Sequence, residues 1–141
     1  MFKKQFESSV GHVHGPSVQL GSRASKKYSD PNAWHSQFYS LVTTKIDEEI
    51  FRPLFPEGKK SGYPNASIRI LVGMSVLKEG FGCSDDDLFE KCEFDLQTRK
   101  APGLELLTDV TPSIDTYYLF RRRSEYQERT SIDLMQQCFE L

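Results

Sequence analysis

The sequence predicts an all-α fold, a compact multi-helix domain packed around one central buried helix. Apolar residues recur every three or four positions in several separate stretches, which is the period of a helix. One stretch, residues 64–80, is apolar around nearly its whole circumference, as is typical of a helix buried on most sides. The chain of 141 residues is long enough to form one such core.

The central helix is predicted to begin at Pro64 and Asn65 and to end near Gly80 and Gly82. Proline suits a first turn because that turn cannot use its missing N–H, and asparagine can cap a free N–H. The glycines suit the left-handed residue that ends a helix. Gly73, in the middle, costs about 1 kcal/mol relative to alanine. Either another helix crosses closely there, or Gly73 is a tolerated weak position.

An earlier amphipathic helix is predicted from Asp30 to about residue 51, with Asp30 as its cap and Pro31 in its first turn. Its apolar stripe should face the central helix and consists of Trp34, Phe38, Leu41, Val42, Ile46 and Ile50. Residues 52–61 contain prolines and a glycine and are predicted to be a loop.

Residues 1–29 are predicted to be a flexible, poorly ordered basic arm, and residues 30–141 the helical domain. The arm is rich in Ser, Gly, Lys and His and has no helical or strand period. The arm has one acidic residue, Glu7. Its basic residues are Lys3, Lys4, Arg23, Lys26 and Lys27. Such an arm can follow DNA phosphates, although solvated basic tails are common. Lys59 and Lys60 form a second small basic cluster beside the central helix.

Several classes of protein are excluded by composition. No apolar run of about 18 residues could span a membrane, and the N-terminus does not resemble a signal peptide, so a cytoplasmic protein is expected. The cysteines are odd in number and lack a Cys-x-x-Cys pair, which favours reduced thiols. His12 and His14 have no nearby ligand to complete a metal site. There is no nucleophile–base pair and no phosphate-binding glycine loop, so no catalytic residue is assigned.

A third helix is predicted from Ser84, which can act as N-cap with Asp87 three positions on. Asp85, Asp86 and Asp87 lie at the positive end of the helix dipole, which is a sufficient structural reason for them. Because consecutive helical residues are about 100° apart, these carboxylates do not converge on one metal ion. The buried edge is expected to consist of Leu88, Phe89 and Cys92.

A fourth helix is predicted from Ser113. Its apolar arc should pack on the core and consists of Ile114, Tyr117, Tyr118 and Phe120. Arg121 falls within that arc and must snorkel or pair. The opposite face holds Asp115, Thr116, Leu119, Arg122, Arg123 and Tyr126. Residues 131–139 again have a helical period, and the chain ends at Leu141 without a stop signal, as a piece of a longer protein would.

The fourth helix is the predicted DNA contact. Arginine can bind guanine or phosphate, and threonine can reach a phosphate or a thymine methyl group. The net charge of −2 argues against a uniformly basic nucleic-acid binder but does not exclude this local face. The candidate DNA-binding residues are Thr116, Leu119, Arg122, Arg123, Lys59 and Lys60. The alternative is that the arginines serve only in ion pairs with Glu125, Glu128 and the aspartate-rich helix.

The order of these motifs resembles the N-terminal domain of bacterial insertion-sequence transposases of the DDE class, over roughly residues 50–140. The motifs are Gly62-Tyr-Pro64, Gly80, the Ser84-Asp-Asp-Asp-Leu88 helix start, and the block with Pro112, Thr116, Phe120 and Arg121 to Arg123. The resemblance implies a helix-turn-helix-like unit that binds double-stranded DNA at terminal inverted repeats, in the bacterial nucleoid. In this unit the Ser84 helix would be the supporting helix and the Ser113 helix would be the recognition helix that contacts DNA.

The resemblance also implies an RNase H-like catalytic domain beyond Leu141, with Mg²⁺ belonging to that domain, so no cofactor is expected for this chain. The alternative function is a protein-interaction or dimerisation module of a transposase, or a non-catalytic remnant. A homodimer could use the aromatic-rich first helix through Trp34, Phe38 and Tyr39.

Overall fold

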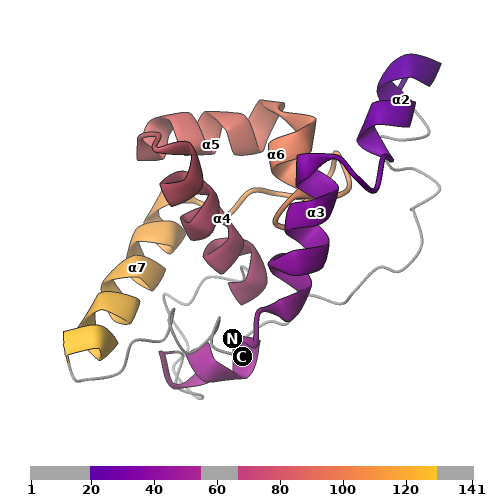
Figure 1. Cartoon of the computed structure of the whole chain (residues 1–141). Coiled ribbons are helices and arrows are strands. Elements are labelled where there is room, and N and C mark those ends of the chain that lie inside the picture. Colours follow the sequence, from indigo (N-terminus) through magenta and orange to yellow (C-terminus); the bar gives the residue numbers. More distant parts are fainter. Residues whose placement is uncertain (1–19, 55–66, 130–141) are drawn as a thin grey trace.

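The computed structural model describes residues 20–54 and 67–129. Within these ranges the chain is helical and forms no β-strand, which confirms the all-α prediction. The elements in chain order are α2 (Ser22–Tyr28), α3 (Trp34–Leu41), the 3-10 helices η1 (Thr43–Lys45) and η2 (Glu48–Leu54), α4 (Ile68–Phe81), α5 (Asp85–Phe94), α6 (Leu96–Lys100) and α7 (Ile114–Arg129). Figure 1 shows α4 between α3 and α7, with α5 and α6 across one end.

Helix α4 is the central buried helix that the sequence predicts. Its buried residues are Ile68, Ile70, Leu71, Val72, Gly73, Met74 and Leu77. The N-cap is Ser67, three positions beyond the predicted start at Pro64, which lies outside the described residues. The helix ends at Gly82, whose φ of 63° is the left-handed conformation that glycine adopts without strain. Gly80 lies inside the helix.

Gly73 allows another segment to pack closely on α4. A close contact is one of the two explanations that the sequence offers for this glycine. A Cβ atom built on Gly73 would lie 2.8 Å from Cβ and 3.2 Å from Cα of Pro102. The neighbour is the turn that follows α6, whereas the sequence suggested a crossing helix. This glycine therefore fixes how closely the α6–α7 connection packs on the central helix.

The long helix predicted from Asp30 to residue 51 is wrong in extent, because α3 ends at Leu41 and two 3-10 helices follow. Residues 42–44 are all β-branched, which disfavours continued α-helix, and the Thr43 hydroxyl donates instead to the Ala101 carbonyl at 2.6 Å. The predicted stripe is broken as a result: Ile46 is buried, while Leu41 is 66% exposed.

The start of this helix also differs from the prediction. Asp30 does not cap it, because its carboxylate accepts from the Asn32 N–H at 2.9 Å and Ala33 is the N-cap.

A helix also occurs where the sequence predicted an irregular arm, since Ser22–Tyr28 form α2. Other predictions lie outside the described residues and stay predictions. They concern Lys3, Lys4, His12 and His14 of the arm, Lys59 and Lys60, Cys138, and the helical period of residues 131–139.

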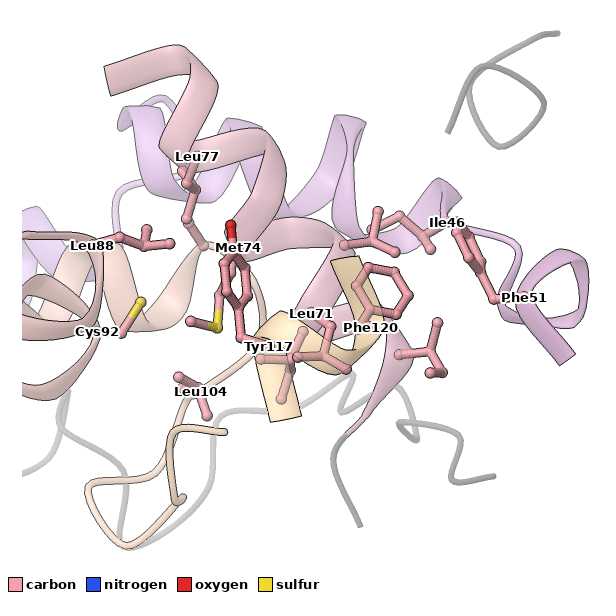
Figure 2. Packing of buried hydrophobic residues seen from close by; sticks show 14 residues of the cluster. Ile46, Phe51, Leu71, Met74, Leu77, Leu88, Cys92, Leu104, Tyr117 and Phe120 are labelled. Carbon is pink, nitrogen blue, oxygen red and sulfur yellow. The ribbon is translucent and has the colours of Figure 1, made fainter. Parts of the chain in front are cut away.

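Side chains of α4 join two halves of one core, shown in Figure 2. Leu88 and Cys92 of α5 pack on one side, as predicted, and Phe51 of η2 with Phe120 of α7 on the other. The Phe51 and Phe120 ring centroids are 5.6 Å apart. The core thus fixes α7 against elements from both halves of the chain.

Arg99 of α6 is buried and organises the connection that leads into α7. Its guanidinium donates to the carbonyl oxygens of Cys92 at 2.8 Å, Leu106 at 3.0 Å and Asp109 at 2.7 Å. A buried arginine must have its donors satisfied, and backbone carbonyls satisfy them here. This side chain therefore holds the loop before α7 in place.

Candidate nucleic-acid interface

Helix α7 begins at the cap that the sequence predicts. The Ser113 hydroxyl oxygen accepts from the Thr116 N–H at 3.2 Å and donates to the Thr116 hydroxyl oxygen at 2.8 Å. The cap satisfies an N–H that the first helical turn leaves without a partner. Thr116, a predicted DNA contact, is half-buried and already takes part in this cap.

The rotation of α7 differs from the predicted wheel. Tyr117, Phe120 and Ser124 are buried at positions i, i+3 and i+7, so the buried arc is turned by about 45° at 100° per residue. Tyr118, predicted to be in the core, is instead 38% exposed. The reason is packing from other elements, because the Tyr117 ring stands edge-on to Phe89 of α5 at 5.4 Å.

Arg121 pairs, as its place in the apolar arc requires. Its Nη1 donates to Asp85 Oδ2 at 3.1 Å, and Lys78 Nζ lies 3.8 Å from Asp85 Oδ1. The Arg121 side chain is 39% exposed, so this pair contributes only about 0–1 kcal/mol to stability. Its effect is orientation: Asp85 holds the guanidinium of Arg121 beside α5.

The exposed face of α7 differs in part from the predicted set. Arg122 is exposed, as predicted, whereas Leu119 and Arg123 are half-buried, and Arg123 already contacts neighbouring groups. Lys59, Lys60 and the side chain of Tyr126 lie outside the described residues. A surface hollow of about 580 Å³ is lined by Asp115, Tyr118, Arg121 and Arg122. Tyr118 and Arg121 were not predicted to lie on this surface, because the sequence does not reveal that Ser124 is buried.

A tight connection joins α4 to α5 through Gly82, Cys83 and Ser84 alone. The Ser84 hydroxyl caps α5 by accepting from the Asp87 N–H at 3.1 Å, as predicted. If these two formed a helix-turn-helix, α5 would be the reading helix. Its charges oppose this role, because α5 has one cation, Lys91, and five acidic residues, Asp85, Asp86, Asp87, Glu90 and Glu93.

Helices α5 and α7 touch through Asp85 with Arg121 and through Phe89 with Tyr117, but α6 and the loop of residues 101–113 separate them in the chain. The predicted pair of supporting and recognising helices is therefore adjacent in space without a tight turn.

Other chemistry finds little support in the described part of the chain. Burial raises the pKa of the Cys92 thiol to about 12, so this thiol is protonated at neutral pH. No group of three His, Cys, Asp or Glu side chains among the described residues could hold a metal ion. No described helix has both the length and the apolar character needed to cross a bilayer.

Comparison with known protein families gives a match over most of the chain. The family model described as Transposase domain (DUF772) matches residues 26–123. No curated protein and no solved structure matches the chain. The matched range begins within α2 and ends within α7 at Arg123, so it includes α3 to α6 and the exposed arginine of α7.

Proposed function

The chain belongs to the transposase-domain family DUF772, and we propose that it binds double-stranded DNA at the terminal inverted repeats of an insertion sequence. The observation that carries this proposal is the exposed Arg122 on a helix whose opposite face is locked into the core by Tyr117 and Phe120. A rigid helix that presents arginine meets DNA at little cost in conformational entropy. Arg121 and Arg123 flank Arg122 in the chain.

The chemistry of the α7 hollow suits base contacts better than phosphate contacts alone. Arg122 has a planar fork of donors that can bind guanine O6 and N7 together. Asp115 lies two turns before Arg122 on the same face. Its negative charge repels phosphate oxygens, but its carboxylate can accept a hydrogen bond from a cytosine amino group. A face of mixed charge favours particular sequences over general attraction to DNA.

The test is a binding measurement with a labelled duplex that contains the inverted repeat flanking the gene, set against a scrambled duplex of equal length. We expect preference for the repeat at 0.15 M salt and affinity that falls as salt rises. Arg122→Ala should weaken repeat binding by about 5- to 150-fold, the value of one good bidentate base contact. Lys45→Ala removes another exposed cation, on η1, and serves as the matched control. Equal affinity for both duplexes in the wild type would refute the proposal.

An exposed aromatic patch favours self-association as a second candidate function. Trp34 of α3 is 40% exposed and meets Phe81 of α4 edge-on, with ring centroids 5.6 Å apart. Phe38 is packed against the core and Tyr39 is half-buried, so Trp34 is the most accessible of the three aromatic residues proposed for a dimer contact. Sedimentation over a wide concentration range tests this candidate. A monomer at every concentration would refute it.

A further inference from the structure

Helix α2 buries very little of itself. Tyr28 is its one buried residue, Ser25 is half-buried, and its other residues are exposed. Its N-cap residue, Gly21, supplies no side-chain hydrogen bond. Helices shorter than about 12 residues are marginal in water without packing, and α2 has seven residues. Contact with a binding partner would supply the stabilisation that burial does not.

The outer surface of α2 consists of hydroxyl groups and cations. Ser22, Ser25, Lys26 and Ser29 follow one another at i, i+3, i+4 and i+7, and together with Arg23 they line a surface hollow of about 700 Å³. The helix contains no acidic residue. Arginine, lysine and serine are side chains that commonly donate to phosphate oxygens in protein–DNA complexes. We propose that α2 is a second DNA-contact element, which holds the phosphate backbone without reading its sequence.

The C-terminal end of α2 is firmly attached to the domain. The Tyr28 carbonyl accepts from Lys100 Nζ at 2.9 Å and from His35 Nε2 at 2.8 Å, and the Lys100 ammonium lies 4.2 Å from the Tyr28 ring centroid. His35 is fully buried, and its Nδ1 accepts from Gln97 Nε2 at 3.2 Å. The attachment leaves Arg23 and Lys26 exposed on α2, as a contact with the DNA backbone requires.

Phosphate fits this surface better than a protein does. The acidic α5 of a second copy would match α2 in charge, but protein interfaces have an apolar centre, and the exposed residues of α2 include no large apolar side chain. Figure 1 shows α2 and α7 on opposite sides of α4. The two helices would therefore contact separate stretches of backbone. This inference rests on the proposed DNA binding, to which it adds a sequence-independent contact.

The experiment measures how affinity depends on salt, for the repeat duplex and for its scrambled counterpart. Lys26→Gln should reduce the slope of log affinity against log salt by about 0.9, and Arg23→Gln with Lys26→Gln by about 1.8. At 0.1 M salt, affinity should fall about five- to tenfold for each lost contact. The preference for the repeat should not change. Lys45→Gln removes the same charge from η1 and should leave the slope as it is.

The outcomes separate this inference from the proposed function. If the wild type binds DNA and the double variant keeps the full salt slope, α2 has no phosphate contact, while the role of α7 stands. If the double variant instead loses self-association in sedimentation at an unchanged slope, the partner of α2 is a second copy. A wild type that binds no duplex at any salt would overturn both. Both side chains are exposed, so the melting temperature should be unchanged.

Discussion

Two glycines of α4 offer an internal comparison. Alanine at Gly80 meets no atom within 4 Å, whereas alanine at Gly73 would place its Cβ 2.8 Å from Pro102 Cβ and 3.2 Å from Pro102 Cα. Both substitutions remove a helical glycine, which stabilises by about 0.5–1 kcal/mol. Only Gly73→Ala forces two packed segments apart. Pro102 is buried, and neither its ring nor its backbone can swing aside as a flexible side chain could.

The steric cost of overpacking is about 1–3 kcal/mol, and the gain from helix propensity largely cancels between the two variants. We therefore expect Gly73→Ala to be less stable than Gly80→Ala by about 1–3 kcal/mol, with Gly80→Ala at or above wild type. Urea unfolding at 25 °C, followed by circular dichroism, measures this difference. Equal stability of the two variants would mean that the turn at Pro102 does not press on α4 and would refute the packing described here.

Three further predictions concern single side chains. Arg99→Met should destabilise the domain by about 3 kcal/mol or more in urea unfolding, because it removes three hydrogen bonds from a charged donor to main-chain oxygens; wild-type stability would contradict this. Asp85→Asn should change stability by less than about 1 kcal/mol but strengthen DNA binding, since it removes the negative charge that pairs with Arg121 and repels phosphate; unchanged affinity in the binding assay would contradict it. Iodoacetamide at pH 8 should modify the half-buried Cys83 but not Cys92 until urea is added, as peptide mass spectrometry can show; rapid labelling of Cys92 in the native state would contradict its burial.

Local signals allowed correct predictions of several elements. The caps at Ser84 and Ser113 bond to N–H groups three residues ahead, and such short-range contacts are legible in a sequence. The buried central helix could also be predicted, because the sequence of α4 is apolar on nearly every side. For Arg121, the need for a partner could be predicted from its position, but the partner itself, Asp85, lies 36 residues away in the chain.

The errors arose where distant residues decide the outcome. The predicted first helix stops early because Thr43 bonds to Ala101, 58 residues away. Helix α2 was missed because its composition is polar and its attachment runs through Lys100, 72 residues from Tyr28. The rotation of α7, which decides what the candidate site contains, is set by rings on other elements. A helical wheel places residues relative to one another but cannot say which side meets the rest of the protein.

The way in which Arg99 holds the loop before α7 bears on how this segment can vary. Its acceptors at Leu106 and Asp109 are main-chain oxygens, which every amino acid supplies. The exposed Leu107 and Val110 should therefore tolerate almost any replacement. Insertion or deletion of a single residue is another matter, since it would carry these oxygens out of reach and tilt the arginine-bearing helix. The length of the loop before α7, more than the identity of its residues, therefore determines how α7 is oriented for the proposed DNA contact.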